Sequence, residues 1–92
     1  MKISELLTSK DKWTQGPEAE DRYGRPVYHD SPRAVCWCLM GALMKCYPDV
    51  VQRDAARMRL YEAIRFPNIM WWNECPERTF VEVKAAVEAA GV

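Results

Sequence analysis

The side chains of this chain that are best suited to chemistry are indoles and amides, with two carboxylates among them. Indole faces stack on planar or sugar ligands, and an amide or a carboxylate beside them fixes the orientation of the ligand. Such a set predicts a ligand pocket, and arginines nearby would favour a nucleotide-like ligand. The residues expected to bind a ligand or partner here are Trp13, Gln15, Asp21, Trp37, Trp72, Asn73 and Glu74.

The same side chains also permit a structural interpretation. Gln15 and Asn73 would then satisfy polar backbone groups of buried irregular segments. The indole rings would fasten loops onto helices. In either case we expect Gln15 or Asp21 to hydrogen-bond with the Asn73 side chain or its neighbouring backbone.

The function that we prefer is that of a non-enzymatic binding module. Two other functions are alternatives. A small hydrolase or transferase would use Asp21 or Glu74 as general acid or base. No nucleophile, base and orienting group can be recognised together in the sequence, so no catalytic residue is assigned. A structural homo-oligomer would instead bury the tryptophans in a large apolar interface.

The cysteines favour neither a metal site nor a cofactor. Cys36 and Cys38, expected on one helix, would point their thiols about 200° apart. Cys46 and Cys75 lack the CxxC spacing of zinc ligands, and His29 is the only histidine. We therefore expect buried, inert thiols.

A pair of arginines is a separate candidate for a partner surface. Arg53 and Arg57 lie four residues apart and would share one face of a helix. That face is either ordinary solvated surface or a contact for an acidic partner or a phosphate.

The composition limits the classes of partner and predicts the cellular compartment. Thirteen basic and thirteen acidic residues cancel, so no overall charge favours nucleic acid or an anionic membrane. The sequence contains no apolar run of the length that a membrane span needs, and no signal-peptide core is visible at its start. We expect a soluble, cytoplasmic protein folded as a single domain over residues 1–92.

Hydrophobic periodicity predicts a mostly α fold, a compact bundle of about four helices. One long structured loop, with a possible short β-hairpin, separates the first two helices, and a tight turn with Gly24 at positive φ is expected within it. The final helix should begin with a capping box at Thr79 and Glu82, end at Gly91 and dock on the central helix. The expected helices cover residues 1–9, 31–46, 49–65 and 79–91, and residues 69–77 show no clear period.

Three stretches together resemble a known family. Their ordered pattern, W-x-Q-G, then W-C-x-x-G-A-L, then N followed by an acid, is similar to small bacterial and phage proteins known only as a domain of unknown function. The sequence departs from the pattern at Glu20, where a basic residue is expected, and at Glu74, where Asp is expected. The stretches begin at Trp13, Trp37 and Asn73.

The resemblance implies a shared helical fold and brings no activity with it. Because relatives occur in phages, one concrete expectation is an antagonist of host defence. Such a protein would sequester a nucleotide signal or cover a protein effector.

Overall fold

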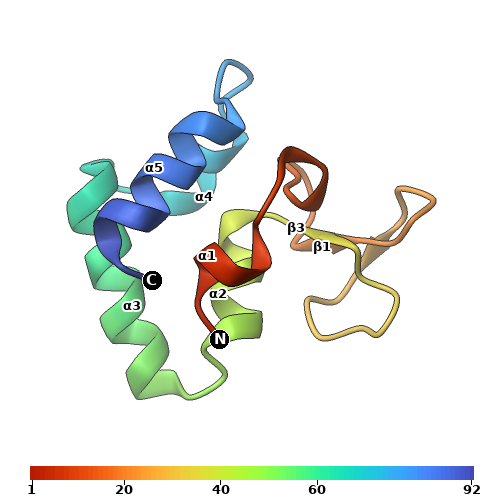
Figure 1. The fold of residues 1–92 in the computed structure, drawn as a ribbon, viewed down its shortest axis with the longest axis horizontal. Coiled ribbons are helices and arrows are strands. Elements are labelled where there is room, and N and C mark those ends of the chain that lie inside the picture. The colour runs from red at the N-terminus through yellow and green to blue at the C-terminus, as the bar shows by residue number, and fades with distance from the viewer.

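Helices make up most of the structure, and a small antiparallel sheet stands beside them (Figure 1). The computed structural model describes residues 1–92. This arrangement confirms the predicted fold class, mostly α with a short hairpin in the long loop. The elements in chain order are α1 (Ile3–Leu6), the 3₁₀ turn η1 (Lys10–Lys12), β1 (Ala19–Glu20), β2 (Pro26–Val27), β3 (Cys36–Trp37), α2 (Leu39–Cys46), α3 (Val50–Ile64), α4 (Ile69–Glu74) and α5 (Phe80–Ala90).

The central helix is shorter than predicted. It begins at Leu39, and the Cys38 thiol caps it by accepting a hydrogen bond from Gly41 N at 3.2 Å. The preceding residues form β3, in which Trp37 pairs with Ala19 of β1. The prediction of a helix from residue 31 was wrong, because β-branched and aromatic side chains also fit a strand and β1 supplies the backbone partners. Val35, which falls within the predicted helix, is 45% exposed.

The sheet has the strand order β2-β1-β3. A tight turn joins β1 to β2, and Gly24 adopts a positive φ of 76° there, as the sequence indicated. On the opposite side, β3 is covered by the N-terminal loop, where Thr14 N donates to Trp37 O at 3.0 Å. β3 thus lies between two backbone neighbours, β1 and the loop, while β2 remains at the edge of the sheet.

Helix α5 has the predicted ends but not the predicted neighbour. Its capping box at Thr79 and its left-handed Gly91 are both present. It packs on α3 and α1 rather than chiefly on α2. The buried face of α3 consists of Ala56 and Leu60, while Val51 is 77% exposed. The period of this helix predicts a buried stripe that includes Val51, Met58 and Leu60. Of these only Leu60 is buried, because apolar residues occur on several sides of the helix and its period alone does not identify the buried face.

Helix α4 arises from the stretch that showed no period. Asn68 caps it by accepting a hydrogen bond from Trp71 N at 3.0 Å. Ile69 joins the core and Asn73 is buried at the helix end. None of the helices of this chain is both long and apolar enough to cross a bilayer.

Gly41 is required by a close backbone approach. A Cβ atom at this position would lie 1.8 Å from the carbonyl oxygen of Glu18. That carbonyl also accepts a hydrogen bond from Cys38 N at 3.2 Å, so it cannot move away without breaking a contact of the sheet. The space beside Gly41 is therefore filled by the loop backbone.

We predict that Gly41→Ala destabilises the protein by about 1–3 kcal/mol, the usual cost of overpacking, although alanine favours helices. Gly16→Ala is the matched control, because a Cβ atom added there would meet no atom within 4 Å, and it should change stability by about 0.5 kcal/mol at most. Urea unfolding measures both. Equal midpoints for the two variants would contradict the close approach.

Candidate functional site

Asn73 lies at the centre of the expected constellation. Its side chain is buried, with 1% of the residue exposed. Its Oδ1 accepts hydrogen bonds from Trp13 Nε1 at 2.7 Å and from Leu39 N at 3.2 Å, and its Nδ2 donates to Thr14 O at 3.3 Å. One amide thereby joins the N-terminal loop, the start of α2 and the end of α4.

Gln15 completes this centre. Its Nε2 donates to Asn73 O at 3.1 Å and to Cys75 O at 2.6 Å. The predicted contact between the loop and the Asn73 turn is confirmed for Gln15. Every buried side-chain nitrogen and oxygen in the chain has a hydrogen-bond partner. This geometry matches the structural interpretation, in which Asn73 and Gln15 satisfy backbone groups of the loop and of the end of α4.

Asp21 lies elsewhere, in the hairpin turn. Its Oδ1 accepts from the backbone N–H groups of Tyr23 and Arg25, each at 2.9 Å, and its Oδ2 accepts from Arg25 Nε at 3.1 Å. The hydrogen bond from the Arg25 backbone is the main cause that lowers the pKa of this carboxyl. A carboxylate held ionised in this way is poorly suited to general acid–base chemistry near neutral pH.

The two indoles Trp37 and Trp72 already have cationic or polar partners. Trp37 is buried and donates from Nε1 to His29 O at 2.9 Å. The guanidinium carbon of Arg78 lies 4.0 Å from the ring centroid of Trp72, and Arg78 Nε donates to Trp72 O at 2.9 Å. A ligand would therefore have to displace Arg78 to stack on that face. Glu74 is exposed at the end of α4.

Three of the four cysteine thiols are buried and poorly reactive. Burial raises the pKa of Cys36 and of Cys46 to about 11, and burial also raises that of Cys38. Such thiols stay protonated at neutral pH and are weak nucleophiles. No three His, Cys, Asp or Glu side chains are grouped so that they could hold a metal ion. The expected helical geometry of Cys36 and Cys38 was wrong, because one lies in β3 and the other caps α2.

Arg53 and Arg57 are half-buried on α3 rather than displayed on its most exposed side. Arg57 forms an ion pair with Asp54 at 3.5 Å. It also lines a hollow of about 260 Å³, together with Tyr61 and Met70. Trp71, next to Met70 in the chain, is 67% exposed.

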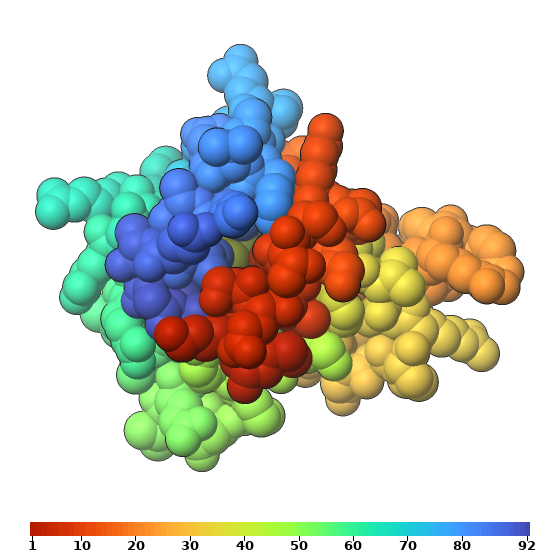
Figure 2. All heavy atoms as spheres, viewed as in Figure 1, coloured from red at the N-terminus to blue at the C-terminus, as the bar shows by residue number.

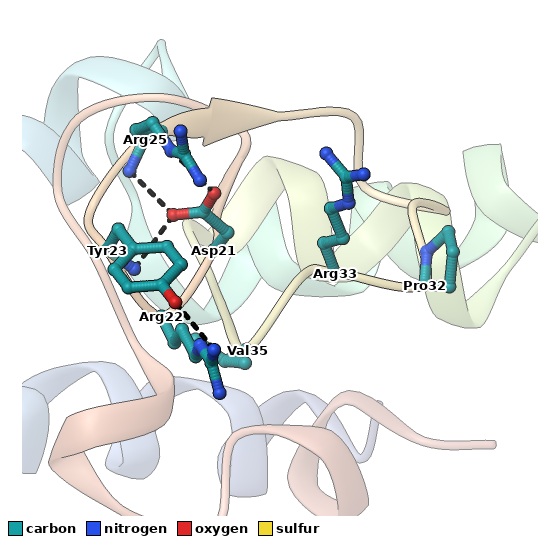
Figure 3. A pocket seen from close by; sticks show the side chains of 7 residues that line it. All are labelled: Asp21, Arg22, Tyr23, Arg25, Pro32, Arg33 and Val35. Carbon is teal, nitrogen blue, oxygen red and sulfur yellow. Dashed lines mark hydrogen bonds and ion pairs between the residues drawn. The ribbon is translucent and has the colours of Figure 1, made fainter.

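A different group of side chains surrounds a hollow of about 500 Å³ at the hairpin tip (Figure 3). Tyr23 stands between two arginines, with the guanidinium carbons of Arg22 and Arg25 at 4.8 and 4.9 Å from its ring centroid. Arg22 also donates to the Tyr23 hydroxyl at 2.5 Å. We call this hollow the arginine groove; it is lined by Asp21, Arg22, Tyr23, Arg25, Pro32, Arg33 and Val35.

Sequence reasoning recognised only Asp21 of this groove as a site residue. The sequence predicts a turn around Gly24, and Arg33 falls in the helix predicted over residues 31–46. The available signal was the clustering of three arginines beside a turn, at positions 22, 25 and 33. In Figure 2 the orange hairpin and the yellow segment after it project from the helical body, so the groove lies on a protruding part of the surface.

Comparison with known families agrees with the resemblance noted in the sequence. The sequence model of a protein family of unknown function, DUF6197, matches residues 2–91 of the chain. No curated protein and no solved structure matches the chain.

We predict that Asn73→Ala lowers the free energy of unfolding by about 1–3 kcal/mol, because the Trp13 and Leu39 donors lose their acceptor. Glu74→Ala, at the exposed neighbouring position, should change it by about 0.5 kcal/mol at most. Urea unfolding followed by tryptophan fluorescence measures both variants. Parental stability in Asn73→Ala would show that the amide does not hold these segments together.

Asp21 gives a pH-dependent prediction. Because its pKa in the folded state lies below the ordinary value, its stabilising effect on the turn is present above about pH 4 and is lost as the pH falls through the lowered pKa. The carboxyl signal of Asp21 should therefore titrate below about pH 3.9 in an NMR experiment, and the amide signals of Tyr23 and Arg25 should move with it. A midpoint at or above that value would rule out the hydrogen-bonded turn.

Proposed function

The chain belongs to the DUF6197 family of unknown function, and we propose that it is a non-enzymatic binding module whose arginine groove holds a phosphate-bearing ligand. The observation that carries this proposal is that three arginines, Arg22, Arg25 and Arg33, line one hollow. The single carboxylate there is already hydrogen-bonded within its own turn. Three positive charges against one negative charge suit a phosphate dianion.

The arginines retain donors for such a ligand. Arg25 uses its Nε on Asp21, and Arg22 uses one terminal nitrogen on the Tyr23 hydroxyl. Arg33 is exposed and takes part in none of the ion pairs of the chain. The planar guanidinium fork matches two phosphate oxygens at once. Tyr23 supports this role by keeping two guanidiniums in place on either side of its ring.

The proposal places the ligand in the groove rather than among Trp13, Gln15 and Asn73. Trp13 Nε1, Gln15 Nε2 and the Asn73 amide are bonded to one another and to backbone. None of the three residues lines either of the hollows at the hairpin. The same argument weighs against the hydrolase or transferase alternative, since Asp21 is committed to its turn.

A protein effector is the second candidate partner. It is favoured by the exposed apolar side chains Phe66, Met70 and Trp71 near the hollow that Arg57 lines. A partner there would contact the helical body rather than the hairpin.

We further propose a cytoplasmic setting, because four free cysteines suit a reducing compartment. The phage context suggested by the family resemblance makes antagonism of host defence one specific role. The module would then sequester a nucleotide signal in the arginine groove.

We predict that inorganic pyrophosphate binds the groove and shifts the NMR amide signals of residues 22–35. Arg22→Gln combined with Arg33→Gln should weaken binding at least about tenfold, since each charge-assisted hydrogen bond contributes roughly 1.5–3 kcal/mol. Arg59→Gln, an exposed arginine on α3, is the control and should bind as the parent does. Binding should also weaken with added salt.

Two results would reject the proposed function. One is the absence of pyrophosphate binding at millimolar concentration. The other is equal weakening by the groove variant and the Arg59 control, which would indicate only nonspecific charge attraction.

A further inference from the structure

A second hollow, of about 660 Å³, adjoins the arginine groove. The two hollows share Pro32 and Arg33 in their linings. The segment carrying both residues follows the hairpin and runs beside it (Figure 3). A ligand larger than a phosphate group can therefore extend from one hollow to the other past Arg33.

The lining of this second hollow differs from that of the arginine groove. Arg33 is its only arginine, and three prolines, at positions 17, 26 and 32, contribute rigid apolar walls. Glu18 is its one carboxylate, and Glu18 Oε2 accepts from the His29 backbone N–H at 2.7 Å and lies 2.7 Å from His29 Nδ1. The hollow thus suits a flat, weakly polar group better than a second anion.

Tyr28 is the aromatic side chain of this hollow and is 77% exposed. The other tyrosines have partners: Tyr23 lies between guanidiniums, and the hydroxyls of Tyr47 and Tyr61 donate to backbone carbonyls. Tyr28 makes no aromatic, cation–π or side-chain hydrogen-bond contact of this kind. Its ring face is therefore available for stacking. A nucleobase of any kind could stack there, because every base presents a π face.

We infer that the second hollow is a base-binding subsite and that the ligand is a nucleotide. The phosphates lie in the arginine groove, Arg33 lies between the subsites, and the base stacks on Tyr28 among the prolines. This inference rests on the proposed function, because it assigns the phosphates to the same groove. It adds the base as the group that separates a nucleotide from inorganic phosphate or a phosphorylated protein.

The test compares inorganic pyrophosphate with the diphosphates of adenosine, guanosine, cytidine and uridine by calorimetric titration. The nucleotides carry the same diphosphate group, so any gain in affinity reports the nucleoside. At least one of them should bind the parent about tenfold or more tightly than pyrophosphate, the gain expected from one stacked base.

Tyr28→Ala should remove this gain and leave pyrophosphate affinity unchanged, whereas Tyr28→Phe should retain it. Trp71→Ala, which removes a similarly exposed aromatic ring outside both hollows, should bind nucleotides as the parent does. The melting temperature of each variant verifies that it is folded, which is expected because Tyr28 is not part of the core.

The outcomes separate the two proposals. If pyrophosphate binds and no nucleotide binds more tightly, the base subsite is rejected while the phosphate groove stands. If neither binds, the proposed function itself fails. A gain that survives Tyr28→Ala, or that Trp71→Ala abolishes, would place the base elsewhere and overturn the inference.

Discussion

The hydrogen bonds of one buried amide determine where the irregular half of this chain lies. Asn73 accepts from a side chain of the N-terminal loop and from the backbone at the start of α2, and it donates back to that loop. In a low-dielectric interior each of these groups needs its partner. The loop is therefore fixed where it covers β3, and β3 in turn holds β1 and the hairpin.

The sequence predicted best the elements whose signals are local. The capping box of α5, its terminal Gly91 and the turn at Gly24 all appear as expected, because each depends on a few neighbouring residues. The start of the central helix was wrong because a long-range partner decided it. Ser31 and Pro32 are good residues for beginning a helix, but pairing with β1 keeps Cys36 and Trp37 extended, and the helix starts only where the strand ends.

The same difference between local signals and long-range partners explains which parts of the candidate site could be predicted. The contact of Gln15 with the Asn73 turn was expected because buried amides satisfy irregular backbone, and it is present although the expected docking of α5 on α2 was wrong. The arginine groove could not, because its walls depend on the hairpin folding beside the segment that carries Arg33. That arrangement requires the three-stranded sheet, which has only two residues in each strand and leaves little trace in hydrophobic periodicity.

The hairpin tip is nearly independent of the core. Between Ala19 and Trp37, only Val27 and Ala34 pack against the buried cluster, and both do so partly. Substitutions in the Arg22–Arg25 turn or at Tyr28 and Arg33 thus leave the helical packing intact. The proposed ligand groove and the core thus lie in separate parts of the chain, so the charge and shape of the tip can diverge during evolution without loss of stability.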